Sequence, residues 1–513
     1  MVNQKMDYNF DKSQFDDLFK KNKGTLLYKK VSTDLITPVQ ASIKLFKAFP
    51  NHHFLFESAQ NNEMGKNAKS RFCVIGIDPD QVWKCTEKES FVNKNFQKNP
   101  HDFTQEDDVN PLENFRNFFK NSQMNFDDLF YQGGQIPAVA CGVFGYFNYD
   151  TVKLIEDISD SDLIDDINIP DSIFIRPQIL VIFDNFFDIA LICAPKFHDS
   201  EASYEDLAEK IENIEEILNR PLENSTLEKP AQSSQERTFQ SNYTKEEYCD
   251  IVKKCKEYIT NGDIFQVLPS QRFTGDFKGL DEFEFYRSLR SLNPSPFLFY
   301  MKMDDFVLTG SSPEIMVSLK NKIVTIRPLA GTRLRGKNIE EDQKIATELL
   351  SDEKEVAEHL MLIDLGRHDV GKVSKPGTVE TTEKMKIEYY SHVMHISSNV
   401  QGELREGLDA LDALKTGFPA GTVSGAPKIR AMQILQELEK TKRSFYAGCV
   451  GYFSGNGDME TCITLRSALI KDDKIYLHAG AGVVYDSIPE LEYQECINKA
   501  AALVKAYQTM KNS

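Results

Sequence analysis

Long apolar runs are missing from this sequence. No stretch of its 513 residues approaches the roughly 18 uninterrupted apolar residues that a membrane-spanning helix needs. The first residues, M-V-N-Q-K-M-D-Y-N-F, lack the basic segment and apolar run of a secretory leader. The sequence therefore predicts a cytoplasmic protein with no membrane partner.

Positive charge is also scarce. Lysine and arginine together number 60 against 78 aspartates and glutamates, which gives a formal net charge of −18. A nucleic-acid binder needs a basic face, so this balance argues against nucleic acid as a partner. An anionic small substrate is still possible, because a few basic side chains in one pocket can outweigh the field of the whole chain.

Cysteine pairs of the C-x-x-C type are absent. The nine cysteines are scattered and odd in number, which is typical of reduced thiols in the cytosol. Cys449, in Y-A-G-C-V-G-Y, could be a nucleophile, but its β-branched and aromatic neighbours favour a buried strand. We therefore expect reduced thiols and a strand at Cys449.

The composition is that of an ordinary globular protein, with 41% hydrophobic and 27% charged residues. Short apolar runs between turn residues predict strands in the first 200 residues. A polar, proline-containing stretch follows, and helices and strands then alternate. We expect an amino-terminal region over 20–220, a linker over 221–242 and a second region over 243–510, with the two regions interlocked.

The second region offers definite local predictions. Thr244 is a plausible cap for a helix that ends near Asn261-Gly262. Further patterns predict a strand over 264–269, a helix over 281–291, and strands over 305–310, 314–319 and 322–327.

Two pairs of glutamates recur at helical spacing. Glu355 and Glu358 lie three residues apart, as do Glu492 and Glu495, with Lys499 one turn further on. Residues three apart share a helix face, so two helices could present paired carboxylates to a common site. Oxygen ligands without a His/Cys cluster suit Mg²⁺ better than Zn²⁺. The same spacing also fits solvated helix faces, and spacing alone does not decide.

Three glycine-containing turns could hold anions. H-A-G-A-G-V-V (478–484) follows a strand pattern, and A-G-T-V-S-G-A-P-K (420–428) leads into a helix whose amino terminus attracts anions. In R-P-L-A-G-T-R-L-R-G (327–336), arginines flank a small turn. Taken singly, each is explained equally well by a tight structural turn.

Taken together, the motifs resemble those of the chorismate-utilising enzymes, and within that family those of the anthranilate-forming members. The resemblance is dense over 243–510 and thinner before it, through F-L-F-E-S (54–58) and G-Y-F-N-Y-D (145–150). Its further stretches include D-I-F-Q-V-L-P-S-Q-R-F (263–273), N-P-S-P-F-L-F-Y (293–300), G-S-S-P-E (310–314), E-H-L-M-L-I-D-L-G-R-H-D (358–369), V-M-H (393–395) and D-M-E-T-C-I-T-L-R-S-A (458–468). It implies the family's α/β (α+β) sandwich, with two large, mostly antiparallel sheets packed centrally and helices outside.

The resemblance also implies a reaction. Ammonia adds at C2 of chorismate while the C4 hydroxyl leaves, and pyruvate is then eliminated to give anthranilate, the first committed step of tryptophan biosynthesis. By the same resemblance, Glu358 and Glu495 hold Mg²⁺, which binds the ring carboxylate. The implied catalytic residues are Glu314 as candidate general acid, His395 for pyruvate loss, and Glu355, Thr422 and Lys499. The implied chorismate-binding residues are Gly331, Thr332, Tyr446, Arg466, Gly480, Ala481 and Gly482. Arg333 and Arg335 have no assigned ligand, and support of the loop is the expected role.

Two positions distinguish among the family members. The aminodeoxychorismate synthases commonly carry a lysine nucleophile where this chain has Ala330, whose methyl cannot attack. The isochorismate and salicylate synthases activate water with a lysine where this chain has Gln266. Both residues favour direct attack by ammonia. The alternatives are component I of an aminodeoxychorismate synthase and a non-catalytic regulator that binds chorismate or tryptophan.

The resemblance implies partners and regulation as well. A fused glutaminase would add a G-x-C-x-G nucleophile turn, and none is present, so we expect a separate glutamine amidotransferase subunit in a hetero-oligomer. Tryptophan commonly inhibits the family. The expected inhibitor site comprises Ser58, Pro296, Phe297 and Leu298, with Glu57 and Lys69 as looser members. A plain core strand is the other interpretation of F-L-F-E-S.

Overall fold

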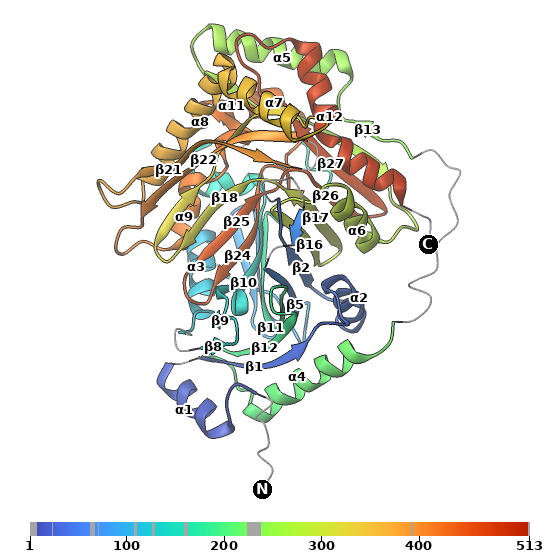
Figure 1. Cartoon of the computed structure of the whole chain (residues 1–513), viewed down its shortest axis with the longest axis vertical. Coiled ribbons are helices and arrows are strands. Elements are labelled where there is room, and N and C mark those ends of the chain that lie inside the picture. Colours follow the sequence, from blue (N-terminus) through green and yellow to red (C-terminus); the bar gives the residue numbers. More distant parts are fainter. Residues whose placement is uncertain are drawn as a thin grey trace.

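The structure is a computed structural model in which strands occupy the centre and helices surround them (Figure 1). It describes residues 8–22, 24–61, 67–69, 71–106, 110–125, 129–158, 163–222, 237–390 and 393–510.

Two sheets are built around two long shared strands, β5 (Phe72–Thr86) and β11 (Ser172–Asp184). These strands pair with each other on both sides of a register shift at Arg176/Pro177. On one side of the shift they belong to the first sheet, and on the other side to the second. Hydrogen bonds therefore join 21 strands into one network, and every pairing between named strands of the described chain is antiparallel.

The first sheet combines strands from early and late parts of the chain. Its order is β1 (Thr25–Ser32), β12 (Ile189–Lys196), β11, β5, β2 (His53–Glu57), β16 (Phe297–Met303), β17 (Phe306–Ser312), β26 (Ser467–Lys471), β27 (Lys474–Gly480), β15 (Ser270–Asp276) and β13 (Gln240–Ser241).

The second sheet also combines strands from early and late parts of the chain. Its order is β7 (Thr104–Gln105), β6 (Glu89–Asn93), β5, β11, β10 (Gly142–Phe147), β24 (Cys449–Ser454), β25 (Met459–Ile463), β18 (Ile315–Lys320), β19 (Ile323–Ile326) and β22 (Val393–Glu403), with β20 (Leu329–Leu334) and β21 (Glu380–Tyr389) also paired to β22. Three two-stranded pairs complete the strands: β3 (Ala59–Asn61) with β4 (Asn67–Lys69), β8 (Phe130–Tyr131) with β9 (Gly134–Gln135), and β14 (Gln266–Val267) with β23 (Gly425–Ala426).

The passage from one sheet to the other is explained by two prolines. Pro79 of β5 lies directly opposite Pro177 of β11. Because proline has no N–H to donate, the ladder is interrupted there and both strands can bend. Arg176, 1% exposed, fixes the bend through Asp80 (2.6 Å) and Asp199 (3.0 Å).

The two sheets pack face to face. One cluster of buried side chains contains Phe54 and Phe299 of the first sheet together with Phe144 and Val450 of the second. Two other clusters lie between each sheet and its covering helices. The predicted sandwich of two large antiparallel sheets is confirmed, and the continuity of those sheets through β5 and β11 is an addition to it.

Helices cover the outside of this sandwich. Figure 1 shows α7, α8, α11 and α12 gathered at the top near β22 and β27, with α1 and α4 at the bottom against β1. No helix of the described residues is long and apolar enough to cross a membrane. The helices are α1 (Lys12–Asn22), α2 (Pro38–Ala48), α3 (Pro111–Asn121), α4 (Tyr204–Asn219), α5 (Lys245–Thr260), α6 (Glu282–Leu292), α7 (Ile339–Ser351), α8 (Glu353–Gly371), α9 (Ala410–Gly417), α10 (Gly421–Ser424), α11 (Lys428–Leu438) and α12 (Pro489–Thr509), with 3₁₀ turns η1 (Ala138–Ala140) and η2 (Tyr149–Leu154).

Most local predictions are confirmed. Thr244 caps α5 in a capping box with Glu247, and α6, β17, β18 and β19 lie where patterns indicated. The strand expected over 264–269 is wrong in length, because β14 covers only Gln266–Val267. Its neighbouring N–H groups bond to two different segments, near Ser424 and near Val483, so no long ladder forms.

The cysteine prediction is confirmed, since all nine cysteines are free and buried and Cys449 begins β24. The division into regions stays a prediction. Most of the expected linker, residues 223–236, lies outside the described residues, while Gln240–Ser241 forms β13.

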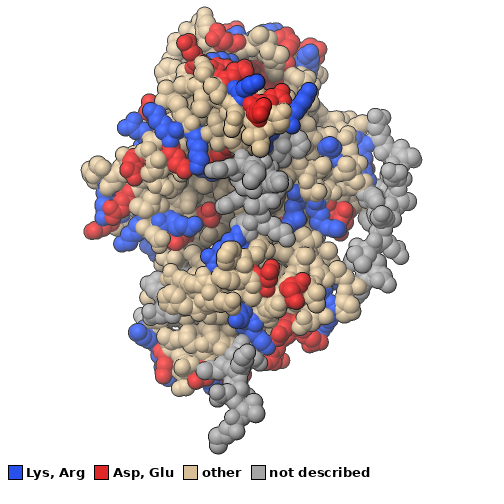
Figure 2. Space-filling model, viewed as in Figure 1, with Lys and Arg blue, Asp and Glu red and all other residues tan. Residues whose placement is uncertain are grey.

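Charge is mixed on the surface. On the face shown in Figure 2, basic and acidic side chains alternate over the upper and middle parts of the molecule. The net charge of −18 is therefore not gathered into one acidic patch on that face.

Candidate active site

The predicted catalytic residues converge beside the second sheet. Glu314 directly precedes β18, His395 lies in β22, and Thr422 lies in α10. The charge of Lys499 in α12 lowers the pKa values of both Glu314 and His395, which shows that Lys499 lies near both residues. The Lys499 Nζ is 3.0 Å from the Gly480 carbonyl and 2.7 Å from Glu495. Five segments distant in sequence thus form one site.

Glu314 is a buried carboxyl, 7% exposed. Burial raises its pKa to about 8, although the nearby Thr422 hydroxyl, the Leu329 backbone and the charge of Lys499 each lower it somewhat. The Thr422 Oγ1 makes no well-formed hydrogen bond with any described residue, although it lies close enough to Glu314 to lower the pKa of that carboxyl. At neutral pH Glu314 therefore carries a proton that it can donate.

His395 is oriented by a bulge in β20. The register of β20 and β22 shifts at Gly331, whose φ of +65° favours glycine. Its carbonyl lies 3.1 Å from His395 Nδ1, and the Thr332 hydroxyl is also 3.1 Å away. Because a carbonyl only accepts, Nδ1 must carry the proton and Nε2 is left as an acceptor. Burial lowers the pKa of His395 to about 4, so the ring is a neutral base at physiological pH.

Arg466 offers an unpaired cation. Its guanidinium forms no hydrogen bond or ion pair with the residues that the structure describes. Burial lowers its pKa, while Tyr446 and Glu495 raise it, which places both groups nearby. A half-buried guanidinium without a partner is favourable for a carboxylate ligand, which its planar fork can bind with two hydrogen bonds.

The glycine loop packs too closely for larger residues. A Cβ at Gly480 would lie 2.8 Å from the Pro269 carbonyl and 3.0 Å from the Tyr446 hydroxyl, and one at Gly482 would lie 2.9 Å from Gln266 Nε2. The Ala481 N–H already donates to the Pro269 carbonyl. Among the described residues, the Gly482 N–H has no backbone acceptor. It is therefore a better candidate than the Ala481 N–H to donate a hydrogen bond to a ligand.

Both carboxylate pairs face this region. Burial raises the pKa of Glu358, and its neighbour Glu355 raises it further; the same holds for Glu492 beside Glu495. Gln266 Nε2 donates to Glu358 Oε1 at 3.0 Å. In each pair one glutamate already has a cation, because Glu355 binds Arg333 and Glu495 binds Lys499.

These carboxylates fit a divalent cation only as a partial set. No group of three or more His, Cys, Asp or Glu among the described residues is arranged to enclose a metal. Glu358 and Glu495 supply hard oxygen atoms on two helices near Lys499. Mg²⁺ commonly uses one or two protein carboxylates and takes water and substrate oxygens for the rest, so this donor set suits it.

The arginines of the R-P-L-A-G-T-R-L-R-G turn bind protein carboxylates, as expected for a supporting role. Arg333 donates to Glu355 (2.9 Å) and Asp352 (2.7 Å), at the start of α8. Arg335 clasps Asp342 of α7 at 2.5 and 3.0 Å. They tie β20 to both helices.

Sequence reasoning missed a group behind His395. Glu388 is the cross-strand partner of His395, pairs with Arg327, and accepts a hydrogen bond from the Tyr390 hydroxyl at 3.1 Å. The Tyr390 ring meets the His395 ring edge-on, with centroids 5.3 Å apart. Only the register of β21 against β22 reveals this arrangement, and no sequence motif marks it.

The predicted inhibitor residues line one cavity of about 540 Å³. Ser58, Pro296, Phe297 and Leu298 face it together with apolar side chains of both sheets, including Phe72, Val450 and Tyr452. The side chain of Lys69 lies outside the described residues; its backbone pairs with Ala59.

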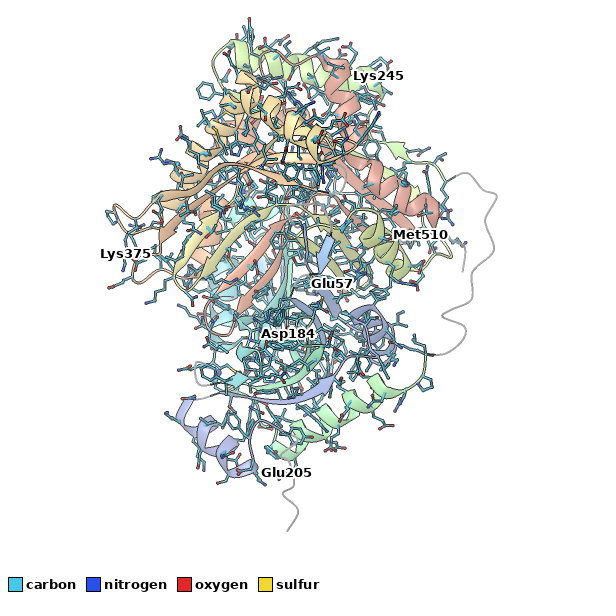
Figure 3. The ribbon with its side chains drawn as sticks, viewed as in Figure 1. Glu57, Asp184, Glu205, Lys245, Lys375 and Met510 are labelled. Carbon is cyan, nitrogen blue, oxygen red and sulfur yellow. The ribbon has the colours of Figure 1, made fainter. Side chains whose placement is uncertain are left out.

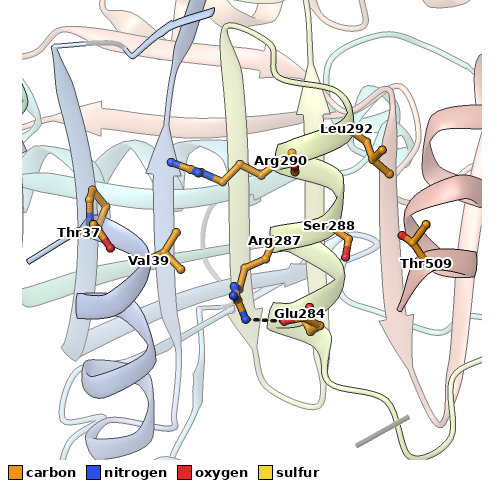
Figure 4. Close-up of a pocket in the computed structure, with 10 residues that line it drawn as sticks. Thr37, Val39, Glu284, Arg287, Ser288, Arg290, Leu292 and Thr509 are labelled. Atoms are coloured by element: carbon orange, nitrogen blue, oxygen red, sulfur yellow. Dashed lines mark hydrogen bonds and ion pairs between the residues drawn. The ribbon is translucent and has the colours of Figure 1, made fainter. Parts of the chain in front are cut away.

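Glu57 forms part of the cavity wall, with its charge already paired. Arg290 binds its two oxygens at 2.6 and 2.9 Å, and the Tyr286 hydroxyl donates at 2.5 Å. Figure 3 places Glu57 near the middle of the molecule. Arg290 reaches it from α6, where it also lines a separate surface cavity of about 580 Å³ beside the Arg287–Glu284 pair (Figure 4).

Comparison with known proteins identifies the family of this chain. A family model for chorismate binding enzymes matches residues 52–505. The chain is 44% identical to anthranilate synthase component 1 from Cereibacter sphaeroides over 96% of both chains, and 42% identical to that from Aquifex aeolicus over 95% of both. It therefore belongs to the chorismate binding enzyme family, in the branch of the anthranilate synthase component 1 chains.

Solved structures show the same fold. Anthranilate synthase component I from Streptococcus pneumoniae has a TM-score of 0.75 at 35% identity, covering 92% of this chain and 98% of that one. The menaquinone-specific isochorismate synthase from Escherichia coli, 18% identical, has a TM-score of 0.68 over 96% of this chain and 99% of its own, and shares the fold.

Proposed function

We propose that this chain is the synthase subunit of an anthranilate synthase, converting chorismate and ammonia to anthranilate and pyruvate. The observation that carries the proposal is one site that combines a protonated carboxyl (Glu314), a neutral imidazole (His395) and an unpaired guanidinium (Arg466). Each group matches one requirement of that reaction: an acid, a base and a carboxylate anchor.

Substrate binding follows from the distribution of charge. Chorismate has two carboxylates, and Arg466 with Tyr446 and the Gly482 N–H suits the enolpyruvyl one. Glu358 and Glu495 would hold Mg²⁺, which when bound supplies positive charge for the ring carboxylate. Without such a cation, the ring carboxylate would be repelled by the negative charge of the nearby glutamates.

Glu314 acts in the first stage. Ammonia forms a bond to C2 as the bond from C4 to its hydroxyl breaks, and the Glu314 proton converts the leaving group to water. Thr422 and Lys499 lie beside this carboxyl and favour the carboxylate that remains.

His395 acts in the second stage. Its Nε2 takes the proton from C2, the electron pair forms the aromatic ring, and the bond to the enolpyruvyl oxygen breaks. The enolpyruvate takes up a proton to become pyruvate. The bond from Nδ1 to the Gly331 carbonyl keeps the ring in the required tautomer.

The choice of nucleophile rests on two neutral side chains. Ala330 stands immediately before the bulge at Gly331 and has no atom that could attack C2. Gln266 directs its amide nitrogen to Glu358 and offers no base to activate water. Both features favour ammonia.

One assay tests the activity. The purified chain is incubated with chorismate, Mg²⁺ and ammonium at alkaline pH, and anthranilate fluorescence and pyruvate are followed, with an EDTA-treated sample as control. We expect both products in equal amounts and loss of both with EDTA. A 4-amino product without pyruvate would indicate an aminodeoxychorismate synthase, and no product would leave only a binding role.

The ammonia supply is proposed to be a separate glutamine amidotransferase subunit in the cytoplasm. The name component 1 of the relatives implies a second component. Adding the matching amidotransferase should make glutamine a better nitrogen source than ammonium. Unchanged rates with glutamine would contradict this partnership.

Tryptophan is proposed to inhibit by binding the cavity of about 540 Å³ at Ser58. The cavity is large enough for an indole and offers apolar walls with polar groups at Ser58 and Glu460. Ser58→Phe should abolish inhibition and retain activity. An enzyme indifferent to millimolar tryptophan would end the proposal.

A further inference from the structure

A second, much smaller cavity touches Glu314. Its volume is about 30 Å³, and it lies among β18, β19, α8 and α10. Most of its lining is apolar, but Glu314, Thr422 and Asp369 also border it. A space of this size holds one water molecule, which needs two or more polar partners.

The polar lining has unused hydrogen-bonding capacity. Among the described residues, neither the Thr422 Oγ1 nor the Asp369 Oδ1 has a hydrogen-bond partner, although both atoms are buried. Asp369 is 4% exposed and Glu314 is 7% exposed. Buried polar atoms without protein partners are commonly satisfied by ordered water.

Asp369 also connects this cavity with the surface. Its Oδ2 accepts a hydrogen bond from the buried Lys428 at 2.8 Å, and Lys428 is held in turn by the Thr416 carbonyl at 3.1 Å. Its Oδ1 lies 3.7 Å from the ammonium of Lys372, whose side chain is 44% exposed. This carboxylate therefore borders the cavity and also lies next to a partly solvated cation.

We propose that this cavity holds a water molecule through which Asp369 returns protons to Glu314, with Lys428 as the residue that positions Asp369. The proposal rests on the proposed role of Glu314 as the acid. After Glu314 has protonated the leaving hydroxyl, it is a carboxylate with substrate on its other side. In one concerted relay the cavity water gives this carboxylate a proton and takes one from Asp369, while Asp369 takes one from the Lys372 ammonium. Solvent then returns a proton to Lys372, so no charge accumulates.

The first variant adds a methyl group at the cavity wall without harming the helix. Gly366 of α8 lines the cavity, and a Cβ there would meet Val400 at 3.5 Å and Ile326 at 3.7 Å, which are ordinary contacts. Alanine also has a higher helix propensity than glycine. Gly371→Ala is the matched control, because it lies in the same helix, faces open space and does not line the cavity.

The second variant removes the charge that relays protons. Asp369→Asn keeps the side-chain shape, and Asp364→Asn, on the exposed side of α8, is its control. Because Asp369→Asn leaves the buried Lys428 unpaired, its thermal midpoint is measured beside its activity.

The readouts are kcat, the KM for chorismate and the solvent deuterium isotope effect, with ammonium as nitrogen source. Gly366→Ala and Asp369→Asn should each lower kcat about tenfold, a fraction of what general acid catalysis contributes. KM should change less than about twofold, and the isotope effect should rise as proton return becomes limiting. A high-resolution structure of the unmodified protein should show the water.

Three outcomes overturn the relay: a dry cavity, unchanged kcat and isotope effect in both variants, or a loss confined to Asp369→Asn, which the unpaired Lys428 would explain. Glu314→Gln separates this from the function itself. If Glu314→Gln is inactive while Gly366→Ala is normal, only the relay fails. If Glu314→Gln is fully active, the proposed acid fails and the relay with it.

Discussion

At the scale of single residues, burial decides which side chains of this site can transfer protons. Glu314 and His395 both lose most of their contact with water, and both are driven toward the neutral form. One becomes an acid and the other a base over the same pH range, from about 4 to about 8. The pair is therefore set for opposite tasks by the same physical cause.

Glu314→Gln should inactivate the protein and stabilise it at high pH. The folded-state pKa of about 8 exceeds the usual 4.5, so between these values the folded state holds a proton that the unfolded state has lost. Stability therefore falls as pH rises from about 4.5 to about 8, by on the order of 5 kcal/mol. Glutamine at position 314 has no proton to lose over this range, so the Glu314→Gln variant should not show this loss of stability.

Urea unfolding at pH 5 and pH 9 measures the effect, with the exposed Glu257→Gln as control. Equal pH dependence in Glu314→Gln and the unmodified protein would show that the carboxyl is not held neutral.

Ala330→Lys should lower anthranilate formation about tenfold or more, because an amine would stand where ammonia must arrive. Ala330→Met has similar length without the amine and separates bulk from charge. Initial rates with saturating ammonium provide the comparison. Full activity in Ala330→Lys would show that the residue at position 330 does not determine which nucleophile attacks C2.

At the scale of elements, the site depends on an irregular strand. The bulge at Gly331 turns its carbonyl out of the β20–β22 ladder and toward His395. Arg333, in the same strand, and Arg335, just after its end, tie it to α8 and α7. A regular strand would have used that carbonyl for pairing and left His395 free to adopt either tautomer.

Gly331→Ala tests the bulge. The φ of +65° costs a residue with a Cβ about 1–2 kcal/mol, and that Cβ would lie 3.2 Å from Glu355, Ile396 and Leu349. Activity should fall more than stability explains, since the carbonyl must move away from His395.

Gly377→Ala is the control for Gly331→Ala, with a φ of +81° in open space. Gly377→Ala should show a similar loss of stability from backbone strain, measured by the urea midpoint, and should keep full activity, measured by kcat. Equal loss of activity in the two variants would argue against a special role for the bulge.

The sequence predicts elements better than it predicts contacts. The cap at Thr244 and the helical spacing of Glu355 and Glu358 are local, and both appear in the structure. The bonds of Arg333 to Glu355 and of Gln266 to Glu358 join residues 22 and 92 positions apart. Such contacts depend on how sheets and helices pack, and no local pattern contains that information. The family resemblance could propose candidate site residues, but it could not give their partners.

At the scale of the whole molecule, the two regions expected from the sequence share both sheets. In the first sheet, β2 pairs with β16, and in the second, β10 pairs with β24. Arg116 of α3 adds ion pairs to Asp409 and Asp412 at the start of α9. Each region alone would expose open strand edges and half of a core.

Residues 243–510 produced alone should therefore fail to fold, and the full chain should unfold in one transition. Circular dichroism and urea unfolding of the fragment and the full chain test this. The control is co-expression of the fragment with residues 1–242, which should restore at least part of the fold. A fragment with its own cooperative transition would contradict the interlocked arrangement.

The facing prolines of β5 and β11 have a mechanical consequence. Two continuous backbones run from the sheet that carries β2 and β16 into the sheet that carries β18 and β22, and Arg176 clamps them where they bend. Torsion of one sheet is therefore transmitted to the other through covalent bonds, with no flexible loop to absorb it. The proposed inhibitor cavity, which both sheets line, and the candidate catalytic residues beside β18 and β22 are thus linked through these two shared strands.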